Sequence, residues 1–141
     1  MSIKVYIDTN VYLNSLQERD KEISKKVLTF LEERDIKIFV NDLSIINIHY
    51  ITRKSMSKEL IKSELKKILS KHSVVPIDKF IIENSLDSEF KDFEDGVQFF
   101  CAKRVEADLI ITNNPKDFKE SDIKIMTPLE FYSEYIQRNE K

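Results

Sequence analysis

Short apolar runs alternate with longer amphipathic stretches along the chain, and this alternation restricts the fold more than any other feature. Runs with the length and composition of strands occur at residues 3–7, 37–40, 73–77, 109–111 and 123–126. Strands that alternate with helices indicate an α/β protein with a parallel sheet. The run 109–111 is apolar at every position, which is typical of a strand covered on both faces. We therefore predict a three-layer α/β/α sandwich with a mainly parallel central sheet.

The stretches between these strands have apolar residues at helical spacing, which predicts the sides that pack inward. Helices are expected from residue 11, over 21–34, from residue 43, over 57–70, 79–90 and 93–106, and around residue 131. The apolar positions of the helix near residue 43 are Leu43, Ile46 and Tyr50. The inward positions expected in 57–70 are Leu60, Ile61, Leu65, Ile68 and Leu69. Those expected in 93–106 are Phe93, Val97, Phe100, Cys101 and Val105.

The composition excludes several classes of site. The length of 141 residues predicts one domain over 1–141. A single glycine rules out the glycine-rich phosphate loops of nucleotide-binding folds. The single cysteine, Cys101, rules out an internal disulfide and a cysteine-based zinc site, and we expect it to be buried and inert. No run has the length and hydrophobicity of a signal peptide or a membrane span, so we expect a soluble cytoplasmic protein with no membrane partner.

Charge is unevenly distributed along the chain, although the formal net charge is only -2. Residues 53–71 contain seven basic and two acidic residues, whereas residues 78–95 contain seven acidic residues and two lysines. The net charge argues against a protein that coats nucleic acid nonspecifically. A local basic margin beside an acidic site is compatible with it.

Polar residues follow two of the expected strands. Asp8 and Asn10 come directly after the strand 3–7, and Asn114 and Asp117 come after the strand 109–111. Asp95 lies in the first turn of the helix 93–106. Because ligands of parallel sheets bind at the carboxyl ends of the strands, we expect these side chains to converge there. Carboxylate and amide oxygens suit Mg²⁺ or Mn²⁺, and such ions can promote phosphodiester hydrolysis.

Each of these segments also has a purely structural interpretation. Asp8 is well placed to cap the helix that follows it, and Asp92 to form a capping box with Asp95. Asn114 followed by Pro115 is typical of an ordinary turn. The common position of all three segments at one edge of the expected sheet favours a site over these separate interpretations.

Three segments resemble the signature blocks of PIN domains. They are YIDTNVYL (6–13), FEDGVQFFCA (93–102) and LIITNNPKDF (109–118), and their order and strand contexts agree with that family from residue 3 to about residue 131. The resemblance implies a PIN-like α/β/α nuclease that acts on single-stranded RNA with Mg²⁺ or Mn²⁺. The small bacterial single-domain members of the family are mostly VapC-like toxins, each inhibited by a cognate antitoxin.

The resemblance also implies roles for individual residues. Asp8, Asp95 and Asp117 match metal-binding acids of the family and are the expected catalytic residues. Asn114 matches a position that is Asn or Asp in many members, so we include it among the expected metal ligands. Asn10 and Thr112 match positions that hold the carboxylates and the substrate phosphate.

One position departs from the family pattern. PIN domains usually place a glutamate in the helix after the second strand, and Asn47 stands where it is expected. Asn47 can still provide a neutral oxygen ligand, but the site loses one negative charge, which Asp42 or Glu94 could replace. His49 is two residues from Asn47 and therefore points elsewhere on the helix, so we interpret it as a surface or core histidine.

The expected function is a metal-dependent endoribonuclease that hydrolyses single-stranded RNA. The resemblance to VapC-like toxins implies a cognate antitoxin as partner and a homodimer. Lys54 and Lys58, in the basic region, are expected to guide RNA phosphates, the alternative being that this region is only a solvated helix face. The alternative function is a PIN-fold binding module with catalysis impaired by Asn47, which binds RNA or a protein partner.

Overall fold

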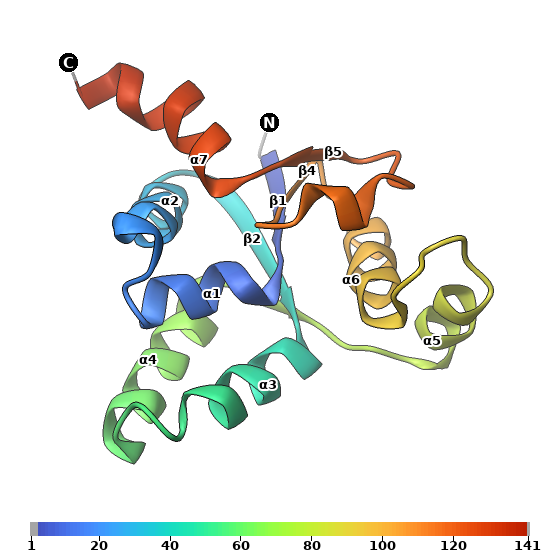
Figure 1. The fold of residues 1–141 in the computed structure, drawn as a ribbon, viewed down its shortest axis with the longest axis horizontal. Coiled ribbons are helices and arrows are strands. Elements are labelled where there is room, and N and C mark those ends of the chain that lie inside the picture. Colours follow the sequence, from blue (N-terminus) through green and yellow to red (C-terminus); the bar gives the residue numbers. More distant parts are fainter. Residues whose placement is uncertain (1–2, 141) are drawn as a thin grey trace.

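A computed structural model describes residues 3–140 and shows a five-stranded sheet between two layers of helices (Figure 1). The strands are β1 (Ile3–Ile7), β2 (Ile36–Asn41), β3 (Ser73–Val75), β4 (Leu109–Ile111) and β5 (Lys124–Met126). The helices are α1 (Thr9–Leu16), α2 (Ile23–Glu32), α3 (Asp42–Thr52), α4 (Lys58–Lys71), α5 (Lys79–Leu86), α6 (Phe93–Arg104) and α7 (Pro128–Phe131). Two short 3₁₀ turns, Asp20–Glu22 and Pro115–Phe118, lie between them, and Tyr132–Ile136 and Gln137–Glu140 continue α7.

The order of the strands creates a crevice next to β1. The order is β3-β2-β1-β4-β5, and all four pairings are parallel. From β1 the chain proceeds outward through β2 to β3, and it then returns to the other side of β1 to form β4 and β5. Such a change of direction leaves a crevice at the carboxyl ends of the two central strands, which is the usual ligand site of these sheets. Ile7 is in register with Ile111, so the residues after β1 and β4 leave the sheet side by side.

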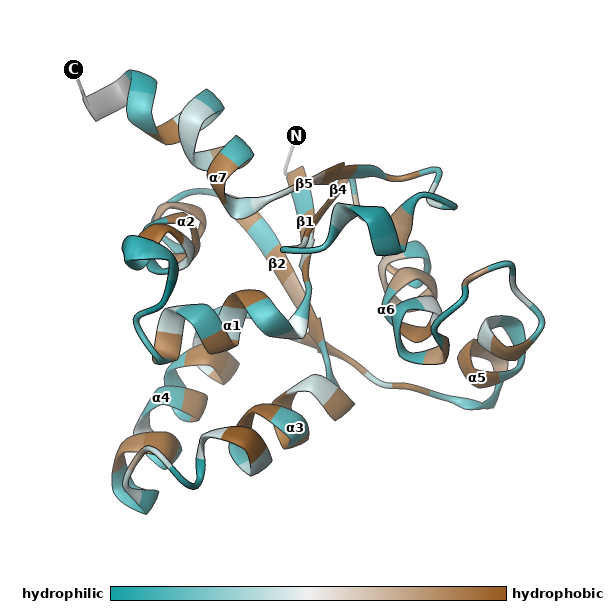
Figure 2. Ribbon diagram, viewed as in Figure 1, coloured by the Kyte–Doolittle hydropathy of each residue, from teal (hydrophilic) through white to brown (hydrophobic). Residues whose placement is uncertain are grey.

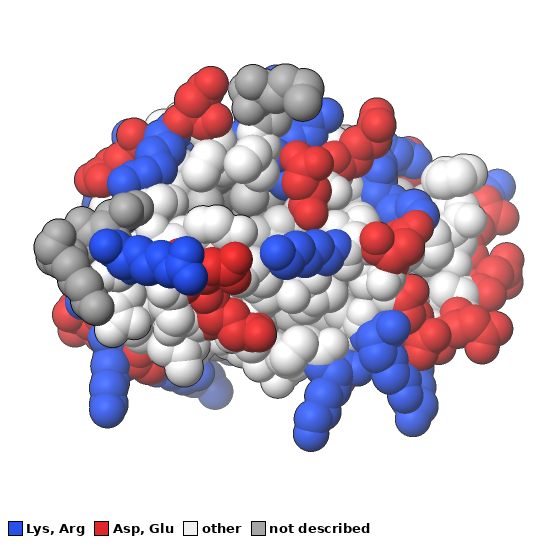
Figure 3. Space-filling model, turned by 90° about the horizontal axis from the view of Figure 1, so that it is seen from above, with Lys and Arg blue, Asp and Glu red and all other residues white. Residues whose placement is uncertain are grey.

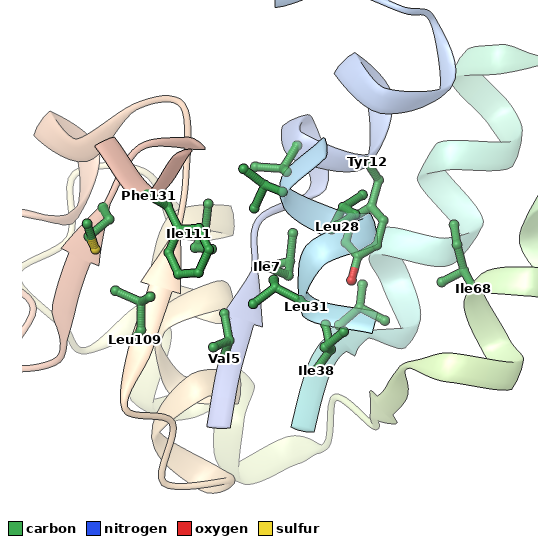
Figure 4. Close-up of a cluster of buried hydrophobic side chains, with 14 of the residues drawn as sticks. Val5, Ile7, Tyr12, Leu28, Leu31, Ile38, Ile68, Leu109, Ile111 and Phe131 are labelled. Carbon is green, nitrogen blue, oxygen red and sulfur yellow. The ribbon is translucent and has the colours of Figure 1, made fainter. Parts of the chain in front are cut away.

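Side chains alternate across β1 and thereby supply both cores. Val5 and Ile7 face one side, where they pack with buried residues of α2, α4 and α7 such as Leu31, Ile68 and Phe131 (Figure 4). This cluster fixes the layer of helices that contains α1, the helix that directly follows Asp8.

The opposite core fixes α5 and α6 against the sheet. It contains Tyr6 and Ile110 from the sheet, Ile81 from α5, and Val97 and Phe99 from α6. The α/β/α sandwich predicted from the sequence is therefore confirmed, with a fully parallel sheet. Within residues 3–140, no helix has both the length and the apolar character that a membrane crossing requires.

Several expected elements differ from the structure at their ends. The strand expected over 73–77 ends at Val75, because Pro76 has no N–H to continue the ladder. The helix expected over 79–90 ends at Leu86, and the one expected over 93–106 ends at Arg104. The helix expected over 21–34 begins only at Ile23, because residues 20–22 have positive φ angles of 51°, 54° and 65°. These differences leave the order of the elements unchanged.

The inward faces predicted for two helices were partly wrong. In α4, Ile61 and Ile68 are buried, but Leu60 and Leu69 are 47% and 49% exposed. Each of these leucines is adjacent in sequence to a buried isoleucine, which rotates it by about 100° around the helix and away from the core. Phe93 of α6 is also exposed, at 45%.

The prediction of a helix near residue 43 is confirmed, but its apolar residues do not mark the buried side. Leu43, Ile46 and Tyr50 are exposed, whereas Ser44 and Ile48 are buried. The helix α3 is hydrophobic along much of its length (Figure 2), so its sequence does not identify which side packs.

Candidate active site

The side chain of Asp8 lies at the crevice between β1 and β4. Its backbone N–H donates to the Ile111 carbonyl at 3.0 Å, and its Oδ2 accepts a hydrogen bond of 2.8 Å from Thr112 Oγ1. Asp8 is the residue before α1, yet its side chain forms no capping hydrogen bond there. The capping interpretation of Asp8 is therefore wrong: the residue is only 6% exposed, and its carboxylate is held by Thr112, directly after β4 on the other side of the crevice.

A pocket of about 360 Å³ opens above this crevice. It is lined by residues from α1, α3, the start of α6 and the segment after β4. Among them are six of the residues selected from the sequence, namely Asp8, Asn10, Asn47, Asp95, Asn114 and Asp117. Thr112 does not line the pocket but contacts it through its hydrogen bonds to Asp8 and to the Asn114 backbone N–H, the latter at 3.1 Å.

The ionised form is disfavoured for two carboxyl groups in the pocket, Asp8 and Asp95. Burial raises the pKa of Asp8, as does the charge of Asp117, while the hydrogen bonds from Thr112 and the Thr9 backbone oppose this shift. Burial also raises the pKa of Asp95 to about 7, together with the charges of Asp92, Asp117, Asp8 and Glu94. The pocket therefore concentrates negative charge that a bound cation would relieve.

The start of α6 serves both structure and site. Asp92 Oδ1 accepts a hydrogen bond of 3.1 Å from the Asp95 backbone N–H, so Asp92 caps the helix, but the predicted capping box is incomplete because the Asp95 carboxylate does not bond back to Asp92. The carboxylate of Asp95 itself lines the pocket. After β4, residues 115–118 form a 3₁₀ turn, which agrees with the turn interpretation of Asn114-Pro115 and also carries Asp117 to the pocket.

Beneath the pocket lies a buried polar network that the sequence analysis missed. Gln98 of α6 donates from Nε2 to Thr9 Oγ1 at 2.9 Å and to Ser44 Oγ at 3.3 Å. Its Oε1 accepts from the Tyr6 hydroxyl and from Asn41 Nδ2. The signal available in the sequence was a lone glutamine between two core residues, Val97 and Phe99.

This network links the elements that present the pocket acids. Thr9 is adjacent to Asp8, Ser44 is one helical turn before Asn47, and Gln98 is one turn after Asp95. The Thr9 and Ser44 hydroxyls also contact each other at 2.6 Å. A single glutamine side chain thus connects α1, α3 and α6 at the pocket.

A sequence model of the PIN domain family matches residues 4–116. The chain belongs to the PIN domain family. The matched part includes Asp8, Asn47 and Asp95 and ends one residue before Asp117. The family resemblance inferred from the three sequence segments is therefore confirmed.

Named relatives of this PIN domain include Ribonuclease VapC1 of Aquifex aeolicus, which is 28% identical over 137 residues, 92% of this chain and 94% of that protein. Among solved structures, VapBC2 from Rickettsia felis, bound to a DNA fragment from its promoter, has a TM-score of 0.66 at 21% identity, covering 89% of this chain and 98% of that one. A toxin-antitoxin complex from Klebsiella pneumoniae has a TM-score of 0.67 at 21% identity, covering 88% and 97%. These structures share the fold of this chain.

The position that departs from the PIN domain pattern lies in the pocket. Asn47 is half-buried and lines it together with Glu94. Asp42 does not line it, because its carboxylate accepts hydrogen bonds from the backbone N–H groups of Leu43 and Ile77. Of the two acids considered as replacements for the missing charge, only Glu94 is therefore placed to act. His49 is exposed on α3 outside the pocket lining.

The two lysines selected from the sequence of this PIN domain lie apart from the pocket. Lys54 follows α3 and Lys58 begins α4; both are exposed, and neither lines the pocket. Cys101 is fully buried in the core, as expected, and burial raises the pKa of its thiol to about 12.

The donor set fits a hard divalent cation, but it is loosely arranged. All the candidate ligands are carboxylate or amide oxygens, which Mg²⁺ and Mn²⁺ prefer. Among the described residues, no three Asp, Glu, His or Cys side chains lie close enough together to hold one metal ion directly. This arrangement matches the way Mg²⁺ is usually held, by one or two carboxylates and several waters.

Proposed function

We propose that this PIN domain is a metal-dependent endoribonuclease that hydrolyses phosphodiester bonds of single-stranded RNA. The observation that carries the proposal is the convergence of Asp8, Asp95 and Asp117, from three separate segments, on one pocket at the crevice beside β1. The similarity to Ribonuclease VapC1 supports the same reaction class.

In this proposal Asp8, Asp95 and Asp117 would hold Mg²⁺ or Mn²⁺ together with bound water, with Asn47 and Asn114 as neutral oxygen ligands or orienting groups. A divalent ion bound there supplies Lewis-acid activation of water and of the phosphate. Thr112 fixes one oxygen of the Asp8 carboxylate through its hydrogen bond of 2.8 Å. Asn10 lines the pocket and is proposed to position the phosphate, whereas Thr112 is fully buried and is proposed to act through its bond to Asp8.

The Asp95 carboxyl links cation binding to pH. With a pKa of about 7 it holds a proton in part of the molecules at neutral pH. The ionised carboxylate would be the form that holds a cation, so metal affinity should rise with pH. The neutral side chain of Asn47 lowers the charge of the ligand set, whereas Glu94 adds a carboxylate to the lining.

We also propose that the protein is the toxin of a toxin–antitoxin pair, with a cognate antitoxin as partner, and that it forms a homodimer. The support is the similarity to toxin-antitoxin structures from Rickettsia felis and Klebsiella pneumoniae. Size-exclusion chromatography with light scattering, alone and after coexpression with the product of an adjacent small gene, tests both statements.

The first experiment is cleavage of a mixed-sequence single-stranded RNA by wild type, Asp8→Asn and Asp35→Asn, each in Mn²⁺ or in EDTA. Asp35 is exposed and outside the pocket, so Asp35→Asn makes the same chemical change without touching the site. We expect cleavage by wild type and Asp35→Asn only with Mn²⁺, and none by Asp8→Asn. Full activity of Asp8→Asn would refute the assignment.

The alternative, a binding module with impaired catalysis, follows from Asn47 and is tested by Asn47→Glu. An active site that tolerates asparagine should change its rate only modestly, whereas an impaired site should gain cleavage. His49→Glu adds the same charge to the exposed side of the same helix and serves as control. Wild type that binds Mn²⁺ but cleaves nothing, beside an active Asn47→Glu, would establish the binding module.

A further inference from the structure

Charge alone does not identify a surface for a polyanion on this molecule. Basic and acidic side chains are interspersed over the face drawn in Figure 3. One lysine-lined hollow lies along α4, with Lys62, Lys66 and Lys67 at its margin, but it shares no residue with the pocket. All of its lining residues belong to α4, so it is a shallow strip along one helix.

A second hollow, of about 430 Å³, adjoins the candidate active site directly. It shares Asp92, Asp95 and Asp117 with the pocket, so the two form one continuous depression. Its other lining residues include Lys91, before α6, and Lys116 and Lys119, in and after the 3₁₀ turn. We call the part lined by these three lysines the lysine groove.

The three lysines of this groove are not used by the fold. Although Glu120 and the three shared aspartates line the same hollow, none of the three ammonium groups forms an ion pair with a described residue. At the end of α6, by contrast, Lys103 pairs with Asp122 at 2.7 Å and Arg104 with Asp78 at 2.6 Å. The groove thus presents unpaired cations next to the acids, which lowers the repulsion that a phosphate chain meets there.

An aromatic ring is fixed in the same groove. Phe90 is partly buried and lines it, and its ring packs against Phe99 at 5.0 Å and Phe118 at 6.1 Å between centroids. Cations that track a backbone, together with an aromatic side chain at which a base can stack, are the combination that binds single-stranded nucleic acid.

We propose that the lysine groove holds the phosphates of single-stranded RNA next to the bond that is cleaved, through Lys91, Lys116 and Lys119. This proposal rests on the proposed function and names where its substrate lies. It replaces Lys54 and Lys58 as the main phosphate contacts, because neither lines the pocket or the groove.

The test measures binding separately from cleavage. A fluorescently labelled 12-nucleotide single-stranded RNA is titrated with the full chain in EDTA, by anisotropy, between 50 and 200 mM KCl. The groove variant is Lys91→Gln/Lys116→Gln/Lys119→Gln, and the matched control is Lys54→Gln/Lys58→Gln/Lys62→Gln, which removes the same charge. Because all six lysines are exposed, both variants should fold, which circular dichroism and thermal unfolding check.

Three phosphate contacts to a single strand should contribute about 2 to the magnitude of the slope of log affinity against log salt. This slope corresponds to a roughly 20-fold loss of RNA affinity between 50 and 200 mM KCl. We expect the groove variant to lose that slope and the control to keep most of it. A groove variant that binds like wild type, or a control that loses more, overturns the proposal. An equal loss for a 12-base-pair DNA duplex also overturns it, since the groove would then bind any polyanion.

These outcomes are distinguishable from failure of the proposed function. RNA binding that depends on the groove, without cleavage in Mn²⁺, supports the groove and refutes the nuclease. Where wild type does cleave, the groove variant should raise KM with little change in kcat, because its lysines lie beside the reacting phosphate and not at it. Absence of RNA binding by wild type at 50 mM KCl in EDTA would refute the groove, and cleavage in Mn²⁺ would then still support the nuclease.

Discussion

Gln98 offers the sharpest test of how the pocket is held together, through the substitution Gln98→Met. Methionine keeps the length and approximate volume of the side chain but removes its amide. The Tyr6 hydroxyl is buried and donates to Gln98 Oε1, so it loses its acceptor. Thr9 and Ser44 lose a shared donor but keep their mutual contact at 2.6 Å. A buried polar group without a hydrogen-bond partner costs about 1–3 kcal/mol, so we expect Gln98→Met to lower the free energy of unfolding by about 2–3 kcal/mol.

A double-mutant cycle with Tyr6→Phe tests how the network shares its partners. Tyr6→Phe alone removes the hydroxyl and leaves Asn41 Nδ2 with Gln98 Oε1 at 3.3 Å, so it should cost about 1–2 kcal/mol. In the double variant no tyrosine hydroxyl lacks an acceptor, but the buried Asn41 Nδ2 loses both of its acceptors. Because these two effects oppose each other, the double variant should cost about the sum of the single variants, within about 1 kcal/mol.

The assay is urea unfolding in EDTA at pH 7 and 25 °C, followed by circular dichroism, with a common m-value checked for all four proteins. A double variant that costs less than the sum of the single variants by about 2 kcal/mol or more would refute the reasoning, because Asn41 Nδ2 would then not depend on these two acceptors. If Gln98→Met lowers the free energy of unfolding by less than about 0.5 kcal/mol, the reasoning is refuted as well, because substitutions of exposed residues have effects of that size.

Three further changes test the pocket and the layer of α1, α2 and α4. The pKa of Asp95 is raised from its ordinary value near 4 to about 7 in the folded chain, so the stability of the metal-free protein should fall as pH rises from 4 to 7. Asp95→Asn should weaken this pH dependence, measured as the melting temperature from pH 4 to 8. Millimolar Mn²⁺ should raise the melting temperature of wild type by mass action, and Asp8→Asn should lose most of that shift in the same scans; an unchanged wild-type curve would contradict a metal site. His72 lies buried between the Tyr12 hydroxyl at 2.9 Å and Glu32 at 2.6 Å, so His72→Leu should cost about 2–4 kcal/mol in urea unfolding by leaving that hydroxyl unpaired.

The sequence was sufficient for the parts of this molecule that depend on local pattern. The apolar run of β4 and the alternation of elements predicted the parallel sheet, because such a sheet must be covered on both faces. The convergence of Asp8 and Asp117 followed from the position of each after a strand, since parallel strands end at one edge.

What the sequence could not provide were properties set by tertiary packing. The side of α3 that is buried was not readable, because apolar residues occur all around that helix. The role of Gln98 depends on side chains 54 to 92 positions away in the chain, Ser44 and Tyr6 among them, which no local window contains. The lysine groove likewise combines a residue before α6 with two that follow β4.

The neutral residue at position 47 leaves the charge of the pocket unevenly placed. A missing carboxylate would be expected to leave the pocket poor in charge, yet Asp92 and Glu94 both contribute to the raised pKa of Asp95. Negative charge is therefore concentrated at the start of α6, on the side of the pocket that faces the lysine groove, while α3 presents a neutral amide. A cation in this pocket should accordingly lie closer to α6 than to α3. Metal affinity should then fall more in Glu94→Gln than in Asn47→Ala, as measured by Mn²⁺ titration, and the reverse order would show that α3 carries the site.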